Sequence, residues 1–396
     1  MSDLTQESRA LRDLAPDALR GFALLGILLV NIPFLAVSSD EGARGQWVSG
    51  SANNIATFIM VALFQGKFYL LFSFLYGYSS HYIVKGERAN RKRWVKRCFL
   101  LILLGALHFT FLWHGDILFA YGLFGLLFIP FLFRKDRTLK IWAILLYLFF
   151  AVMLTAIAAL TYFAEQVDPE SFIVNTPDLD KVMLSGNYLE SLAPRAELWA
   201  LGFFGSGILV QGGFAFIAFL VGLRAARASA LNLDSGIWSR EQSTSKMMKI
   251  GYLIGLPIQL ACAAVFLWNE HQTKVSEGLF ILTIIISFTA APLLSMAYVG
   301  SILRLLKQRP GWFEGMRNAG QMSLTTYLMQ SLILTLIFGN WGLGLFQSID
   351  IWLVFLMGIA IWLLQLRFAS FWIAKYRQGP FENLVSRFTK GSRLAN

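Results

Sequence analysis

The sequence predicts an all-α, polytopic membrane protein with about ten transmembrane helices and both termini in the cytoplasm. The first observation is composition, because 56% of the 396 residues are hydrophobic and only 14% are charged, against roughly a quarter in an ordinary soluble domain. The second is a series of long apolar runs. The third is the distribution of lysine and arginine among the loops that join these runs. Together they exclude an ordinary soluble enzyme, a disordered chain and a disulfide-built secreted domain.

The apolar runs are long enough to cross a bilayer, which takes roughly 20 residues of helix. Lipid offers no hydrogen bonds to the backbone, so runs of continuous apolarity favour helices over the alternating strands of a barrel. We expect spans at 19–37, 66–84, 95–113, 116–133, 141–163, 198–222, 250–268, 278–303, 322–340 and 350–372. Residues 53–63 are predicted to form an interfacial amphipathic helix that leads into the second span.

The loops alternate in charge. The predicted topology puts 29 of the 34 lysines and arginines on one side, and leaves Arg44, Lys67, Lys181, Arg195 and Lys274 for the other. Cytoplasmic loops carry the excess of basic residues, so the basic side is predicted to be inside. Both termini then lie inside, and an even number of spans follows. The basic side is expected to attract anionic lipid head groups, and no exposed basic domain is available for nucleic acid.

The chain is predicted to be one integral membrane domain over 1–396. Residues 19–163 supply the first five spans and the candidate site, 164–197 an acidic outer loop, 198–372 the last five spans, and 373–396 a basic cytoplasmic tail. Arg9 and Arg12, followed by an apolar stretch, are also typical of a cleavable signal peptide. The length of the first run favours its retention as a span.

Ionisable side chains within a membrane usually serve a partner or a water-filled cavity. Five polar side chains are predicted to share the outer half: Lys67, His108, His114, Asp116 and Tyr121. An imidazole oriented by a carboxylate is suited to proton transfer, and a nearby ammonium stabilises oxyanion charge. Each residue also has a structural interpretation. Lys67 can extend to the interface, Asp116 can cap a helix, His114 can be a turn residue, and His108 can be a satisfied core histidine.

A second group lies toward the inner side and deeper in the bundle. Asp17 and Arg20 stand one turn apart at the start of the first span, and Asn31 lies further along it. Gln330 belongs to a polar stripe on the ninth span, which either lines the interior or joins helices by hydrogen bonds. No span carries paired His or Glu at metal-ligand spacing, so neither a metal nor a bound cofactor is predicted.

These residues occur in stretches that resemble the YeiB family of bacterial inner-membrane proteins, whose activity is unassigned. The stretches are Asp17-Ala18-Leu19-Arg20-Gly21 continuing to Asn31, Gly66-Lys67-Phe68, His108 with Gly115-Asp116-Ile117-Leu118 and Tyr121-Gly122, and Gly320-Gln321-Met322-Ser323 continuing to Ser331 with Gly379-Pro380-Phe381-Glu382. The resemblance implies a multi-pass protein of the bacterial cytoplasmic (inner) membrane.

The family is similar, more remotely, to membrane acyltransferases such as the heparan-alpha-glucosaminide N-acetyltransferases and those that modify bacterial surface sugars. That similarity implies acyl-CoA as a cytoplasmic donor and an acceptor on the far side. The shared mark is the Asp17–Arg20–Gly21 opening. One branch has a histidine eleven residues after the arginine, and here that position is Asn31, which cannot act as a base. The other branch has its histidine in the first outer loop, and 38–54 contains none.

The leading hypothesis is therefore a transferase that moves an acyl group from a cytoplasmic donor to a small-molecule or glycan acceptor outside. In it His108 is the base, Asp116 orients it and Lys67 stabilises oxyanion charge. Arg20 and Asp17 hold the donor, while Asn31, His114, Tyr121 and Gln330 contact substrate. Two alternatives stay open: a small-solute permease with a His108–Asp116 proton relay, and a membrane protein without chemistry. Oligomeric assembly stays open as well.

Overall fold

The computed structural model describes residues 14–168 and 178–390, and every regular element among them is helical. The all-α prediction is confirmed for this part of the chain. Arg9, Arg12, residues 169–177 of the predicted acidic loop and residues 391–396 of the predicted tail lie outside the described residues. The first half holds α2 (Leu14–Asn31), α3 (Pro33–Ala36), η1 (Gly45–Trp47), α4 (Ser51–Ile59), η2 (Met60–Phe64), α5 (Lys67–Val84), η3 (Arg88–Asn90), α6 (Arg91–Phe111), α7 (Leu118–Leu127), η4 (Ile129–Phe131) and α8 (Asp136–Val167).

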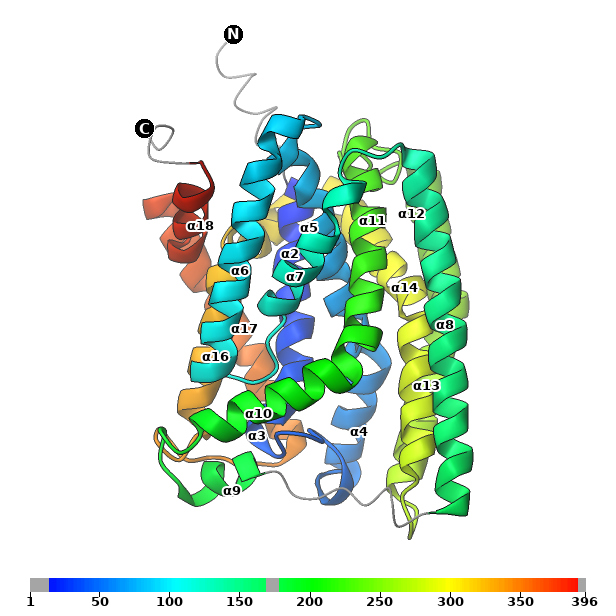
Figure 1. The fold of residues 1–396 in the computed structure, drawn as a ribbon, viewed down its shortest axis with the longest axis vertical. Coiled ribbons are helices and arrows are strands. Elements are labelled where there is room, and N and C mark those ends of the chain that lie inside the picture. The colour runs from blue at the N-terminus through cyan, green and yellow to red at the C-terminus, as the bar shows by residue number, and fades with distance from the viewer. Residues whose placement is uncertain (1–13, 169–177, 391–396) are drawn as a thin grey trace.

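The second half continues the bundle. It holds α9 (Asp178–Ser185), α10 (Leu192–Gly202), η6 (Phe203–Gly212), α11 (Gly213–Arg227), α12 (Glu241–Ile250), η7 (Gly251–Gly255), α13 (Leu256–Glu270), α14 (Glu277–Gln308), η8 (Pro310–Phe313), α15 (Glu314–Gln321), α16 (Ser323–Phe338), α17 (Ile351–Tyr376) and α18 (Pro380–Lys390). Most of the long helices run roughly parallel to one axis, and α10 lies across one end of them (Figure 1).

The number of spans is smaller than the ten predicted. Among the described residues, eight helices are long and apolar enough to cross a membrane, or nine if the bent pair Pro310–Gln321 and Ser323–Phe338 is one span. The segment predicted to span at 116–133 holds only the short apolar helix α7, of ten residues, followed by Pro130 in η4, so it is not counted among these helices. The ninth predicted span, 322–340, corresponds to α16 (Ser323–Phe338), which counts as a span only together with the preceding helix Pro310–Gln321, and the two are bent by 80°.

Two further boundaries differ from the prediction. The span predicted at 198–222 begins at Gly207, because residues 192–202 form α10 instead. The predicted outer loop 164–197 contains the end of α8, α9 and most of α10. The helix predicted at 53–63 is formed by α4 and η2, and with α5, after a break around Gly66, it counts as one 34-residue candidate span, Ser51–Val84.

The loops gather at two opposite ends (Figure 1). At one end, Arg227 of α11 binds the backbone oxygens of Leu132 and Arg134, and Lys307 of α14 binds Ser239 O. At the other end, the 38–50 segment, α9, α10 and the 271–276 and 339–350 loops meet. The first end collects the basic loops, and the second carries most of the acidic ones.

The centre of the bundle is α2, which packs against α15 at backbone distance. A Cβ on Gly21 would collide with the backbone of Met316, and one on Gly320 would collide with the carbonyl of Asp17. Small residues at helix crossings allow this approach in membranes. By contrast α8 lies at the edge, and Val152 and Leu160 are 69% and 67% exposed. Such apolar exposure on a long outer helix fits contact with lipid tails.

Candidate functional site

The candidate site is the turn between α6 and α7, at the end of the bundle that α10 covers. His108 lies in the last turn of α6, and Asp116 immediately precedes α7. His108 Nδ1 and Asp116 Oδ1 are 2.9 Å apart, and both side chains are fully buried. The contact is close, but the two atoms are not aligned as a hydrogen bond. Catalytic hydrogen bonds are often loosely aligned before substrate binds. The sequence prediction that these two residues meet is consistent with this geometry.

Glycines make the approach of α6 and α7 possible. A Cβ on Gly105 would collide with Phe119 N and crowd the Asp116 carboxylate. The other oxygen of that carboxylate, Oδ2, accepts the backbone N–H of Phe119 at 2.7 Å in the first turn of α7. Asp116 is thus also the helix cap that the structural interpretation expected. One carboxylate serves both roles, with one oxygen for each.

The second imidazole nitrogen of His108 contacts a residue that is not among the predicted site residues. His108 Nε2 lies 2.8 Å from the hydroxyl of Ser331 in α16, which is buried as well. Ser331, His108 and Asp116 therefore form a chain of three groups in the order hydroxyl, imidazole, carboxylate. The two partners of the imidazole favour a tautomer with the proton on Nδ1 and a free lone pair toward Ser331. Ser331 is 223 residues away in sequence, and no spacing rule joins them.

The α9–α10 segment covers this chain of groups. Tyr188 and Arg195 bind the carbonyl oxygens of Phe111 and Thr110, and Thr335 of α16 binds that of Leu112. These side chains donate hydrogen bonds to the backbone carbonyl groups at the C-terminal end of α6, which have no partner within the helix. The arrangement excludes bulk water from the site.

His114 sits in the same turn as Asp116 and is neutral. Burial lowers the pKa of His114 to about 3, the Ser39 backbone opposes this shift, and the charges of Arg195 and His108 add to it. The prediction that His114 contacts substrate stays a prediction. The residue links the α6–α7 turn to the 38–44 segment.

Lys67 does not join this group. It is the first residue of α5, within the Ser51–Val84 candidate span, and its side chain is fully buried. Its ammonium donates to Val61 O at 2.9 Å and pairs with neither His108 nor Asp116 within ion-pair distance. α5 begins at Lys67, after the left-handed Gly66, in agreement with the predicted span 66–84.

The remaining predicted substrate contacts are distributed over the bundle. Tyr121 bonds to Ser73 of α5 at 2.7 Å, within the core of α5, α7 and α11. Gln330 donates to Leu24 O and to Gln365, so it joins α16 to α2 and α17, as the helix-joining interpretation expected. Asn31 ends α2 and is half-buried.

Asp17 and Arg20, which the sequence places one turn apart, form an ion pair. Arg20 Nη1 lies 2.5 Å from Asp17 Oδ1 near the start of α2. The same turn carries Gly21, which contacts α15. The Asp–Arg–Gly opening therefore has a packing role in this bundle, and a role in donor binding stays a prediction.

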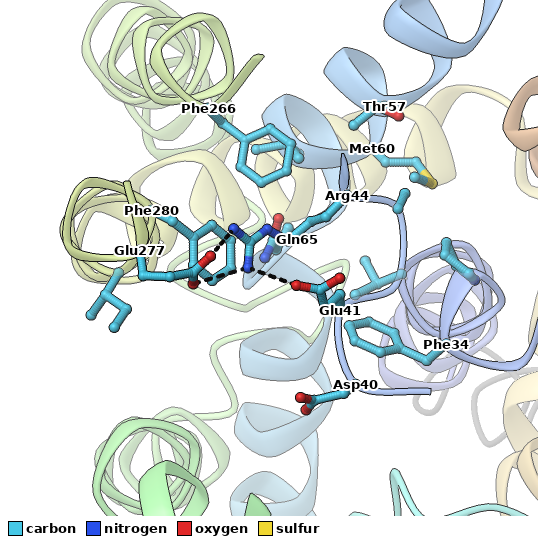
Figure 2. A pocket seen from close by; sticks show the side chains of 15 residues that line it. Phe34, Asp40, Glu41, Arg44, Thr57, Met60, Gln65, Phe266, Glu277 and Phe280 are labelled. Carbon is cyan, nitrogen blue, oxygen red and sulfur yellow. Dashed lines mark hydrogen bonds and ion pairs between the residues drawn. The ribbon is translucent and has the colours of Figure 1, made fainter. Parts of the chain in front are cut away.

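A pocket of about 270 Å³ opens at the acidic end, between α2, the 38–44 segment, α4, α13 and α14 (Figure 2). Arg44 is at its centre. The Arg44 guanidinium lies 2.9 Å from Glu270 and 2.6 Å from Glu277 and stacks on the ring of Phe280 at 3.7 Å. No sequence pattern predicted this pocket. The one indication was that Arg44 is among the five basic residues predicted for the outer side, where such residues are few.

A second pocket, of about 580 Å³, lies at the basic end. Its lining includes Arg88, Arg134, Lys135 and Arg227, with His81 from α5. Arg227 also pairs with Asp136 at 2.8 Å. Neither pocket is lined by His108, Asp116 or Ser331. Within residues 14–168 and 178–390, no group of three or more His, Cys, Asp or Glu side chains is arranged to hold a metal ion.

Comparison with known proteins finds uncharacterized relatives of similar length. The chain is 29% identical to the uncharacterized protein YxaH of Bacillus subtilis (strain 168), covering 92% of this chain and 91% of YxaH. It is 27% identical to the uncharacterized protein YeiB of Escherichia coli (strain K12), covering 96% of each. An uncharacterized 39.9 kDa protein from Bacillus acidopullulyticus is 33% identical over 33% of this chain and 37% of its own length.

Residues 233–392 match the family described as "Protein of unknown function (DUF418)". No solved structure matches the chain. The resemblance predicted from the sequence is confirmed, and this multi-pass membrane protein is similar to bacterial YeiB and YxaH over nearly its full length, while its residues 233–392 match the DUF418 family model.

Proposed function

We propose that the protein is a membrane acyltransferase that carries an acyl group from a cytoplasmic acyl-CoA to an acceptor on the outer side of a bacterial cytoplasmic membrane. The observation that supports this most is the chain Ser331–His108–Asp116, with separations of 2.8 and 2.9 Å. A hydroxyl beside a base that is held by a third group is the general arrangement of an activated nucleophile. Such triads are recognised by geometry and roles on unrelated folds.

The proposed reaction has two steps. In the first, Ser331 Oγ attacks the thioester carbonyl and gives its proton to His108 Nε2. The carbon–sulfur bond breaks, the proton passes to the leaving thiolate, and an ester forms on Ser331. In the second, an acceptor hydroxyl or amine attacks that ester, and its proton returns through His108 to Ser331. Asp116 is a positioning residue that stabilises the imidazolium in both steps.

The proposed direction follows from charge. Basic loops favour the cytoplasmic side, so the end with the basic pocket faces inward in this proposal. Its arginines and lysine suit the phosphates of an acyl-CoA, alongside the predicted contribution of Arg20 and Asp17. Because the buried triad lines neither pocket, the reaction also requires a helix movement that admits both substrates.

The test uses purified full-length protein in vesicles, with acetyl-CoA as donor and glucosamine and glycerol as acceptors. We expect acyl-CoA hydrolysis or transfer to fall about 10²–10⁴-fold in His108→Ala and Ser331→Ala. Ser295→Ala is the matched control, since that serine is also buried but bonds only to the Lys67 backbone. His271→Ala is the control for a histidine at the same end that lies in a loop. Full activity in a folded His108→Ala variant would end the assignment.

A second function is supported by Lys67. Its ammonium is fully buried within a candidate span, and Val61 O is its one hydrogen-bond acceptor among the described residues. Such buried charges are typical of ion and proton pathways. This is the permease alternative, with the His108–Asp116 pair as a relay. Proton-coupled uptake into vesicles without consumption of acyl-CoA, abolished by Lys67→Met, would favour it over acyl transfer.

A further inference from the structure

The pocket at the acidic end is built for a charged ligand with an apolar body. Its walls are aromatic and aliphatic, with Phe34, Phe266 and Phe280 around the side chains at its centre (Figure 2). Its volume of about 270 Å³ is near the lower end of the roughly 300–1,000 Å³ of small-molecule sites. The combination of aromatic walls and few polar groups is the usual composition of such sites.

The charges in the pocket do not cancel. Arg44 is matched by Glu277 at 2.6 Å and by Glu270 at 2.9 Å, and Glu270 is almost fully buried. Glu41 lies further away, at 3.8 Å, and Asp40 also lines the pocket. Figure 2 shows Glu41 on the far side of Arg44 from Glu277, and Asp40 set apart from all three. Arg44 is thus one positive charge near four carboxylates, of which Glu270 and Glu277 are the nearest.

An independent observation also indicates a ligand. The hydroxyl of Thr57 lines the pocket, is 1% exposed, and has no hydrogen-bond partner among the described residues. Buried polar groups normally find a partner. The unused hydroxyl and the excess carboxylates lie in the same cavity, on different elements.

From these contacts we infer that the pocket binds a small organic cation, an ammonium group on an apolar body. The ammonium faces Asp40 and Glu41, the body packs against the phenylalanine rings, and Thr57 lies along the wall of the same cavity. Aromatic faces attract cations in addition to burying apolar area. The described residues offer no metal-binding group, so an organic cation is favoured over a metal ion.

The electrostatics agree with this ligand. Burial raises the pKa of Asp40 and of Glu41 above their ordinary 3.8 and 4.5; Arg44 opposes the shift, and Glu277 adds to it. Asp40 is exposed and Glu41 is partly buried, so a positive charge beside them mainly offsets their repulsion by Glu277. The inference does not depend on acyl transfer, because it concerns a pocket that the triad does not line.

The experiment measures binding to the full chain in lipid nanodiscs at pH 7.5 by titration calorimetry, with empty nanodiscs as the blank. The probes share one body and differ in charge: 2-phenylethylammonium, phenylacetate and 2-phenylethanol. We expect the ammonium to bind at least tenfold more tightly than the other two. The double variant Asp40→Asn/Glu41→Gln is expected to lose at least tenfold in affinity for it, and Thr57→Val a smaller factor.

Asp178→Asn is the matched control, because Asp178 is an exposed carboxylate that pairs only with Lys181. It should leave the affinity unchanged. Equal binding of phenylacetate, unchanged affinity in the double variant, or an equal loss in the control would each overturn the inference. If the double variant does not fold, the affinities of the single variants Asp40→Asn and Glu41→Gln test the same point. These outcomes are separate from the acyl-transfer assay.

Discussion

Asp116 is a residue with two separate tasks, one for each carboxylate oxygen. Oδ2 caps α7 through Phe119 N–H, and Oδ1 faces His108. An asparagine can keep the cap, because its side-chain oxygen still accepts a hydrogen bond. It cannot stabilise an imidazolium by charge. The two tasks are therefore separable by substitution, which distinguishes catalysis from folding.

We expect Asp116→Asn to unfold at nearly the wild-type temperature and to lose about 10²–10⁴-fold in acyl transfer, with a displaced pH–rate profile. Asp116→Ala should lose the same activity and in addition about 1 kcal/mol of stability, because the cap is removed. Thermal unfolding in detergent and kcat/KM against pH check both. A folded Asp116→Asn variant with wild-type rates would contradict the positioning role.

His114 gives a residue-scale prediction about pH. The pKa of His114 is lowered to about 3 by burial, whereas an unfolded histidine titrates near 6.5. The unfolded chain thus binds a proton as pH falls below 6.5, and the folded chain does not. The stability contributed by neutral His114 is complete above pH 6.5 and is lost as pH falls toward 3.

Between pH 7.5 and pH 5, this difference amounts to about 2 kcal/mol. We expect the free energy of unfolding to fall by about that much more in the wild type than in His114→Gln, which has no titrating ring. Chemical denaturation in detergent at the two pH values measures it. Equal losses in both proteins would show that His114 is not held neutral.

At the scale of elements, the bundle depends on close backbone contact between α2 and α15. Gly21 and Gly320 are the contact points, and a side chain at either would meet a backbone carbonyl that cannot move independently. Overpacking costs about 1–3 kcal/mol or more. Since α2 also packs against α5, α16 and α17, the strain would spread through the centre of the bundle.

We expect Gly320→Ala and Gly21→Ala each to lower the unfolding temperature clearly. Gly202→Ala is the control, because a Cβ there meets open space at the end of α10, and alanine is the better helix former by about 1 kcal/mol. The control should unfold at or above the wild-type temperature. Equal behaviour of the three variants would contradict backbone contact as the reason for the glycines.

Sequence patterns predicted the helices that form from continuous apolar runs. They missed the elements in which a proline, a turn or a change of helix direction interrupts such a run. The run at 141–163 is continuous, and α8 follows it closely. The run at 116–133 is equally apolar, but Pro130 interrupts it, whereas the run at 322–340 forms α16 and bends only at its start, at Met322. Likewise Leu198, Trp199 and Leu201 read as part of a span, although they belong to α10. Hydropathy does not report helix direction.

The site was predicted only where its residues are close in sequence. His108 and Asp116 meet because one short turn joins their helices. Ser331, by contrast, comes from α16, and a lone serine in an apolar helix carries no signal. Lys67 begins α5, as the predicted span expects, but its ammonium bonds to Val61 O and does not join His108 and Asp116. Contacts between distant helices need tertiary structure.

At the scale of the whole molecule, two ends of opposite charge character define the proposed direction of transfer. The native cysteines Cys98 and Cys262 are buried, so introduced cysteines can report sidedness. Gln46 is exposed at the acidic end and Lys92 at the basic end. In intact cells an impermeant maleimide should label Gln46→Cys, and it should label Lys92→Cys only after the membrane is opened. The reverse pattern would contradict the proposed orientation.

The most direct measurement is peptide mass spectrometry of the purified full-length protein after brief incubation with ¹³C-labelled acetyl-CoA, without acceptor. We expect one acetyl group on Ser331, lost when an acceptor is added, and absent from His108→Ala and Ser331→Ala. Transfer that proceeds at the wild-type rate in Ser331→Ala, or acetylation confined to other residues, would contradict the proposed role of Ser331, His108 and Asp116.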